Sequence, residues 1–290
     1  MNRFSYVVVS SFFTLAFALY APPASDLRRP IALDKISSGD LYALDMSGSV
    51  IRIAASSGGL SIVGSFELPV FSYPSDLISA KLFGQPALFV SANTQRFGTV
   101  SQYSLEGKLH HRWTLNYAAA GLDVDFNSHT LYIANADRPE IYQISLQETQ
   151  FRDPSFLTEI LGARRLGPLI CDVSKQKLYL GDVEAGEIVE FDLRTRKSRL
   201  LAEGLSSPQG LLLSPDTKLL YIADSSRRKI YALNLQPGKN SPKVFSAISD
   251  FRSPSGITRL EDGRIVVADE RASAIFVLGA NGTLQSTLRQ

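Results

Sequence analysis

Cysteine is almost absent from this chain of 290 residues, and the single cysteine is Cys171. One cysteine excludes an intramolecular disulfide, so an exported form of the chain would have to be stable through packing alone. Cys171 follows Leu169 and Ile170 in a short apolar stretch typical of an inner β-strand, and no histidine or cation adjoins it. Because nothing next to it favours the thiolate, we expect a buried and unreactive thiol.

Histidine is also scarce, with three residues in the chain. His110 and His111 are adjacent, and adjacent side chains of a strand point to opposite faces, so these two cannot bind one metal together. His129 lies in a polar turn. The sequence therefore shows no catalytic dyad or triad, and we expect structural or solvated roles for all three histidines.

An excess of charge of one sign is lacking as well. The chain has 30 Lys and Arg against 28 Asp and Glu, which gives a formal net charge of +2. A nearly neutral balance lacks the strongly basic surface that nucleic acids and anionic membranes attract. We therefore expect no nucleic-acid partner.

Long apolar runs are absent except at the N-terminus. Tyr6–Leu15 is apolar, Arg3 precedes it, and Ala16-Phe17-Ala18 supplies small residues for cleavage. This pattern predicts a signal peptide over residues 1–18, followed by a proline-rich linker over residues 19–30. The alternative is an uncleaved anchor, but the run is shorter than the ~20 residues of a spanning helix. We expect an exported chain, periplasmic or extracellular, with no membrane span after cleavage.

A short apolar strand recurs along the rest of the chain at a spacing of about 45 residues, which is typical of propeller blades. Its six copies are Leu41–Asp45, Leu88–Ala92, Leu131–Asn135, Leu178–Asp182, Leu220–Asp224 and Ile265–Asp269. A partner strand follows each copy at hairpin distance, in the same register. The apolar cores of these partner strands begin at Val50, Val100, Ile141, Ile188, Ile230 and Ile275.

A looser third pattern precedes each pair and contains glycine, as in Pro208–Leu211 and Pro254–Ile257. Glycine at this place suits a crowded position where backbones converge on an axis. Because one such unit cannot bury both faces of its sheet, the units must stack radially. The sequence therefore predicts an all-β fold, a six-bladed β-propeller of four-stranded antiparallel blades, over residues 31–290.

Two local features depend on short segments of the pattern. Residues 31–37 can form the inner strand of the first blade or add an outer strand to the last blade, and the sequence does not choose between them. In the third blade, Asp153-Pro154 resembles the start of a helix, so we predict a short surface helix over residues 153–161.

The unit from Ser206 to Leu235, SSPQGLLLSPDTKLLYIADSSRRKIYALNL, resembles the six-bladed propellers of the NHL and SMP-30/gluconolactonase-like superfamily. Strictosidine-synthase-like proteins are near relatives. The resemblance implies that the lactonase members hold one divalent metal at the mouth of the channel, with ligands near positions that are Gln209 and Ser255 here. The matching positions of other blades are Ser75, Ala120 and Gly167, and Asp76 is the one carboxylate expected near a channel entrance. One carboxylate is too few for a hard cation.

The acidic or amide residues that end the recurring strands are explained by turns, because Asx side chains bond the backbone of their own turn. They are Asp45, Asn135, Asp182, Asp224 and Asp269, with Asn93 displaced by one residue in the second blade.

We expect ligand contacts on the rim at the mouth of the channel, because loops on a rigid scaffold usually carry function. The candidate binding residues are Asp76, Asn93, Arg96, Gln209 and Ser255. The sequence thus favours a cofactor-free binding module for an unidentified small polar ligand or protein partner. The alternative is a lactonase or esterase that depends on a divalent metal such as Ca²⁺, and a metal-free lyase or synthase is a third possibility.

Overall fold

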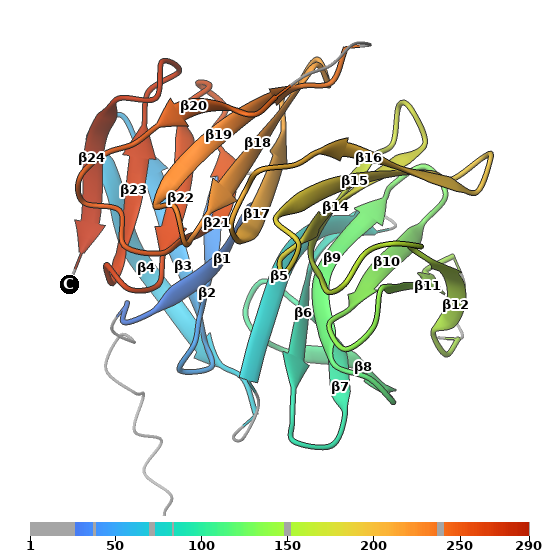
Figure 1. The fold of residues 1–290 in the computed structure, drawn as a ribbon. Coiled ribbons are helices and arrows are strands. Elements are labelled where there is room, and N and C mark those ends of the chain that lie inside the picture. Colours follow the sequence, from blue (N-terminus) through green and yellow to red (C-terminus); the bar gives the residue numbers. More distant parts are fainter. Residues whose placement is uncertain are drawn as a thin grey trace, which may run out of the picture.

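The computed structural model describes residues 27–36, 39–69, 73–82, 84–147, 152–236 and 241–289. These residues form six antiparallel sheets of four strands each, and every sheet consists of four strands that are consecutive in the chain. The sheets stand around a common axis as the blades of a propeller (Figure 1). The predicted all-β, six-bladed architecture is confirmed, and no helix occurs among the residues described.

The strands of blades one to three are β1 (Pro30–Lys35), β2 (Leu41–Asp45), β3 (Ser49–Ser56), β4 (Gly59–Glu67), β5 (Tyr73–Leu82), β6 (Gln85–Asn93), β7 (Gly98–Tyr103), β8 (Leu109–Leu115), β9 (Ala119–Asp125), β10 (Thr130–Asn135), β11 (Glu140–Ser145) and β12 (Ser155–Glu159). The strands of blades four to six are β13 (Leu166–Asp172), β14 (Lys177–Asp182), β15 (Glu187–Asp192), β16 (Lys197–Ala202), β17 (Pro208–Leu213), β18 (Leu219–Asp224), β19 (Lys229–Asn234), β20 (Lys243–Ser246), β21 (Pro254–Arg259), β22 (Ile265–Asp269), β23 (Ala274–Leu278) and β24 (Leu284–Arg289).

The second strand of each blade is the recurring apolar strand of the sequence. All residues of β2 and β22 are buried, as are all but the first residue of β10, β14 and β18. These strands are covered by a neighbouring blade on each face, so they read as continuous apolar runs instead of alternating ones. The fourth strands lie at the outside and are largely exposed, as in β16 and β24.

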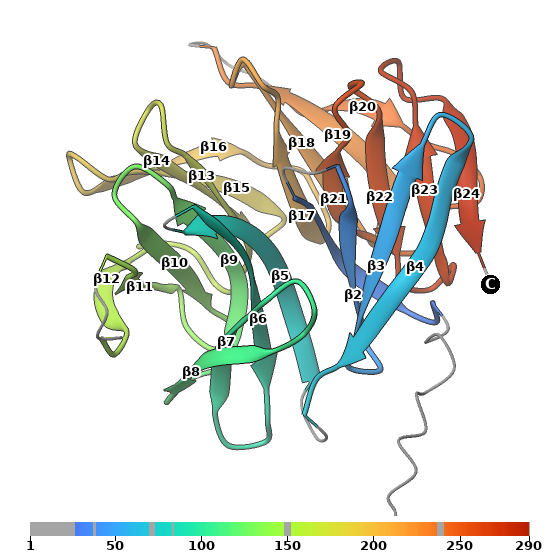
Figure 2. The same cartoon turned by 180° about the vertical axis from the view of Figure 1, so that it is seen from behind.

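The ring closes between the first and last blades. The innermost strands β1, β5, β9, β13, β17 and β21 contact one another in that order, and β21 contacts β1. Because β1 pairs with β2 in the same sheet as β3 and β4, the first blade holds all of its own strands. Figure 2 shows the blade of β21–β24 beside that of β1–β4. Leu27, within the segment predicted as a linker, is buried in the cluster between these two blades.

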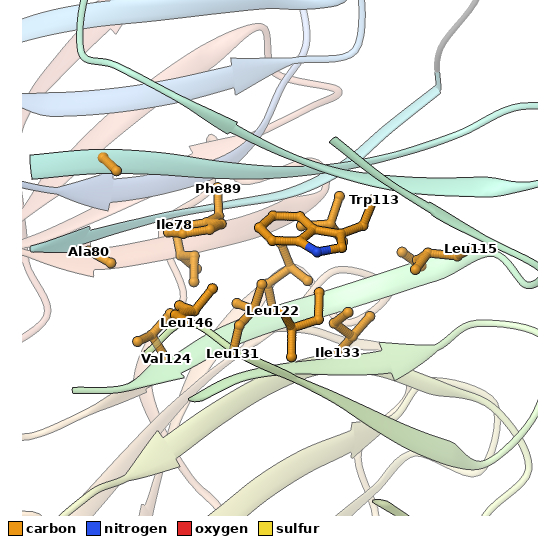
Figure 3. Close-up of a cluster of buried hydrophobic side chains, with 14 of the residues drawn as sticks. Ile78, Ala80, Phe89, Trp113, Leu115, Leu122, Val124, Leu131, Ile133 and Leu146 are labelled. Carbon is orange, nitrogen blue, oxygen red and sulfur yellow. The ribbon is translucent and has the colours of Figure 1, made fainter. Parts of the chain in front are cut away.

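Large side chains fill the spaces between blades. Between blades two and three, Trp113 of β8 packs near Phe89 of β6 and against apolar residues of β9 and β10 (Figure 3). The Trp113 indole Nε1–H donates a hydrogen bond of 2.9 Å to the carbonyl oxygen of Arg152. The buried indole thus keeps a partner for its polar atom.

The residues that end the second strands bond backbone N–H groups, as the sequence predicts. Asp224 accepts hydrogen bonds from the N–H groups of Ser206 and Ser207, which precede the inner strand of its blade, and of Arg227 in its own turn. Asp45, Asp182 and Asp269 make equivalent sets of bonds. These buried carboxylates are therefore occupied within the scaffold.

The predicted helix over residues 153–161 is wrong. Residues Ser155–Glu159 form strand β12, the outer strand of blade three, and Tyr142 of β11 pairs with Phe156. The Asp-Pro signature is local, whereas the sheet pairs four of the five residues of β12 with β11, with a register shift at Leu157. Pairing in the sheet therefore overrides the local helix signal.

The predicted signal peptide, residues 1–18, lies outside the described residues, as does most of the predicted linker. In the described part of the chain, no helix has the length and apolar character needed to cross a membrane.

Candidate functional site

The axis of the propeller contains a cavity of about 180 Å³. All six innermost strands contribute to its wall, so the cavity belongs to the ring as a whole. Three aspartates line it: Asp34 of β1, Asp76 of β5 and Asp123 of β9. They come from consecutive blades and therefore occupy one half of the wall.

Each aspartate joins its own blade to the next. Asp76 accepts a hydrogen bond of 2.8 Å from the N–H of Leu77 on its own strand and one of 2.8 Å from the N–H of Leu122 on β9. Asp123 likewise accepts from Val124 and, on β13, from the N–H of Cys171 at 2.6 Å.

Asp34 repeats this pattern in the first blade. It accepts from the N–H of Lys35 and from the N–H and hydroxyl of Ser79 on β5. The carboxylates thus satisfy backbone donors at the open edges of the innermost strands, where no further strand can pair with them.

The electrostatics of these aspartates are unusual. Burial raises the pKa of Asp76 to about 7, although the hydrogen bonds from Leu122 and Leu77 act in the opposite direction. Burial, aided by the negative charges of Asp34 and Asp76, also raises the pKa of Asp123 to about 7, against the hydrogen bonds from Cys171 and Val124. The pKa of Asp34 is raised by burial too. Burial dominates because it removes water from a charged carboxylate.

The other half of the wall is mostly apolar. Pro168 and Ile170 of β13, Leu212 of β17, and Ile257 and Thr258 of β21 line this half. Among the described residues that line the cavity there is no lysine, arginine or histidine. The cavity therefore pairs an acidic half with an apolar half and holds no cationic side chain of its own.

Of the residues expected at the channel mouth, Asp76 and Gln209 line this cavity. Gln209 is exposed and its amide donates to the hydroxyl of Ser207. Asn93 instead lies beside blade three, where its amide group donates to the carbonyl of Ala119 and accepts from the Ala119 N–H. The structure thus brings two of the five candidates to the axis.

The remaining two candidates lie away from the cavity wall. Ser255 donates its hydroxyl to the carbonyl oxygen of Ala268. Arg96 is exposed, and its backbone N–H bonds the hydroxyl of Thr94.

Sequence reasoning counted one carboxylate near the channel, and the structure corrects this count to three. Asp34 and Asp123 were missed because they lie inside segments that read as apolar inner strands. A carboxylate directly after leucine in an otherwise buried strand, as in Leu33-Asp34 and Leu122-Asp123, was the available signal.

A divalent cation of the kind that the lactonase resemblance implies fits these residues poorly. Ca²⁺ takes six to eight oxygen ligands that converge on one point. Here both oxygens of every aspartate already accept backbone N–H groups, which direct the carboxylates along the wall toward neighbouring strands. No group of three or more acidic, histidine or cysteine side chains is placed to hold one ion anywhere in the described residues.

Residues 171–289 match the model of the family described as "SMP-30/Gluconolactonase/LRE-like region". No curated protein matches the chain. The resemblance that the repeat predicts is confirmed, and the match extends from the end of β13 through the last blade.

Solved structures share the fold at low sequence identity. A chain in the crystal structure of a nidogen/laminin complex is 17% identical, with a TM-score of 0.69, over 84% of this chain and 91% of that chain. A periplasmic gluconolactonase of Pseudomonas aeruginosa is 14% identical, with a TM-score of 0.63, over 90% of this chain and 84% of that chain. A streptogramin B lyase is 14% identical, with a TM-score of 0.65, over 93% of this chain and 85% of that chain.

Proposed function

We propose that this six-bladed propeller, similar to the NHL and SMP-30/gluconolactonase-like proteins, is an exported binding module that takes a small organic cation in its axial cavity. The fold itself does not choose among functions, because its structural neighbours include a chain from a nidogen/laminin complex, a lyase and a gluconolactonase. The proposal rests on the cavity.

The observation that carries it is the imbalance of charge in the cavity wall. Asp34, Asp76 and Asp123 line one cavity, and none of its described lining residues is a cation. A buried carboxylate without a cationic partner must either take up a proton or gain a positive charge from outside. A bound cation supplies that charge and lowers the energy of the ionised carboxylates.

The size and the second half of the wall define the ligand further. A cavity of about 180 Å³ is smaller than the range of roughly 300 to 1,000 Å³ usual for drug-sized ligands, so the occupant is small. Pro168, Ile170 and Leu212 offer apolar contact opposite the aspartates. An alkylammonium ion with a short apolar tail matches both halves.

A metal-dependent hydrolase is the second candidate, and the three carboxylates on one channel are the observation in its favour. Their oxygens are engaged by backbone donors, however, and this speaks for a weakly held organic cation over a resident metal. We propose that the protein works without a cofactor. Metal content and lactone hydrolysis of the purified protein distinguish the two candidates.

The test is calorimetric titration of the purified chain with propylammonium, with propanol as the uncharged probe and Ca²⁺ as the divalent probe. We expect saturable binding of propylammonium, none of propanol, and about tenfold or more weakening in Asp123→Asn. The matched control is Asp262→Asn, whose carboxyl lies at the surface beside Arg264, and it should bind as the wild type does.

Two results would reject the proposal. One is equal binding of propanol and propylammonium, which would remove the role of charge. The other is a stoichiometric divalent ion in the purified protein together with lactone hydrolysis that Asp123→Asn abolishes, which would establish the hydrolase instead.

A further inference from the structure

A second cavity lies away from the axis, between blades one and two, and has a volume of about 280 Å³. One side is formed by Leu68 and Pro69, which follow β4 of blade one. The other side is formed by residues of β6, β7 and β8 of blade two, together with Thr94 and Phe97 between β6 and β7. We call this cavity the inter-blade groove.

The floor of the inter-blade groove consists of two rows that cross three strands. Strand pairing places Val90, Ser101 and Arg112 in one row, since Val90 pairs with Ser101 and Ser101 with Arg112. The neighbouring row consists of Ala92, Thr99 and Thr114. Alternate residues of a strand share a face, so both rows face blade one.

Ser101 is an exception among the blades. The other five blades carry large apolar residues at the position equivalent to Ser101, and these residues fill the space beside the preceding blade. They are Ile51, Tyr142, Val189, Tyr231 and Phe276, each paired with the third residue of the recurring strand. A small serine therefore leaves open a space that the repeat elsewhere closes.

Arg112 is an exception in the same row. The residues that take its place in the outer strands are Ser65, Phe156, Leu200, Val244 and Thr287. The Arg112 Nε–H donates a bond of 3.0 Å to the Ser101 hydroxyl, and Nη2 donates one of 3.5 Å to the Tyr103 hydroxyl. One edge of the guanidinium is thus held by the floor of the groove.

On the other edge of that guanidinium, Nη1 has no hydrogen-bond acceptor among the described residues, and Nη2 keeps a second N–H beside the one that bonds Tyr103. Within the described part of the chain Arg112 belongs to no ion pair. A guanidinium fixed along one edge presents parallel N–H groups along the other, which is the geometry that a carboxylate accepts in two bonds. In the groove, Nη1 and the second N–H of Nη2 of Arg112 are donors of the kind that a carboxylate accepts.

The walls beside this site are apolar. Leu68, Val90 and Phe97 line the groove together with three threonines, of which Thr94 and Thr99 donate their hydroxyls to backbone carbonyls. From the oriented Arg112 and these walls, we propose that the inter-blade groove binds a small carboxylate with an apolar body. This site is separate from the axial cavity and does not depend on the proposed function.

The proposal is tested by calorimetric titration with hexanoate. Hexanol has the same chain without the charge, and acetate has the charge without the chain. We expect saturable binding of hexanoate, and much weaker binding of hexanol and acetate, because the groove offers one partner to each end of the ligand. No saturable binding at the solubility limit of hexanoate, or equal binding of hexanoate and hexanol, overturns the proposal.

Three variants place the binding in the groove. Arg112→Gln should weaken hexanoate binding about tenfold or more, and Arg112→Lys should weaken it less because the charge remains. Ser101→Val, which introduces the residue of the equivalent position in blade four, should fill the groove and abolish binding. The control Arg194→Gln changes an exposed arginine on another blade and should bind as the wild type does.

Folding is followed by thermal denaturation of each variant. Exposed Arg112 can be replaced without opening the core, so Arg112→Gln should keep the wild-type unfolding midpoint. Hexanoate binding that is unchanged in both folded Arg112→Gln and folded Ser101→Val would overturn the site.

Discussion

Replacing Gly210 by alanine is expected to lower the free energy of unfolding by about 3 kcal/mol or more. A β-carbon at Gly210 would lie 1.9 Å from the carbonyl oxygen of Ser255, a backbone atom of the next blade. The clash cannot be relieved by turning a side chain, so two innermost strands must move apart. Because these strands belong to a closed ring, the displacement disturbs the neighbouring blades as well.

Urea denaturation of Gly210→Ala measures this effect, and Gly64→Ala is its control. Gly64 lies in the exposed strand β4, and a β-carbon there would meet no atom within 4 Å. Gly64→Ala should leave the stability almost unchanged or raise it slightly, since alanine restricts the unfolded chain. Equal stabilities of the two variants would show that the inner strands do not converge as closely as described.

The stability of the wild-type protein is expected to fall as the pH rises from about 5 to about 8 through the ionisation of Asp76. Burial raises the pKa of this carboxyl to about 7 in the folded chain, above its usual value near 4. The folded state therefore binds the proton more strongly than the unfolded state does. The stabilisation is complete below the unfolded pKa and is lost as the pH rises through the folded pKa, at a cost on the order of 2 to 4 kcal/mol.

Asp76→Asn isolates this contribution. Asparagine cannot accept both N–H groups that Asp76 accepts, so the variant should be less stable than the wild type at pH 5. The difference in the free energy of unfolding between the two proteins should decrease by on the order of 2 to 4 kcal/mol toward pH 8, because only the wild type is destabilised when Asp76 ionises. Denaturation of Gly210→Ala at the same pH values is the control. The difference in the free energy of unfolding between this variant and the wild type should not change with pH. A gap for Asp76→Asn that does not change with pH would contradict the raised pKa.

Much of the fold can be predicted from the sequence because two strands of every blade, the recurring strand and its hairpin partner, repeat together at the same spacing. The recurring strands from Leu41 to Asp269 are buried on both faces, so their apolar character is continuous and easily seen. The glycine within the innermost strand reflects close approach of backbones, as at Gly210 of β17 and Gly256 of β21. Ring closure could not be predicted, because the pairing of β1 with β2 depends on the positions of both ends of the chain.

The site was less accessible to sequence reasoning. Asp34 and Asp123 lie far apart in the chain and meet at the axis only because their blades are neighbours of blade two. The inter-blade groove could not be predicted because a small side chain, and not a conspicuous one, creates it. Ser101 stands in the aligned repeat among large apolar residues, but a missing side chain gives no signal until the neighbouring blade shows what it would have filled.

The most direct test of the account is titration of the wild-type protein with propylammonium at pH 6 and at pH 8. We expect propylammonium to bind about tenfold more tightly at pH 8, because a proton on a carboxyl with a pKa of about 7 competes with the cation at pH 6. Equal affinities at the two pH values, or tighter binding at pH 6, would contradict a cation site at the axial aspartates.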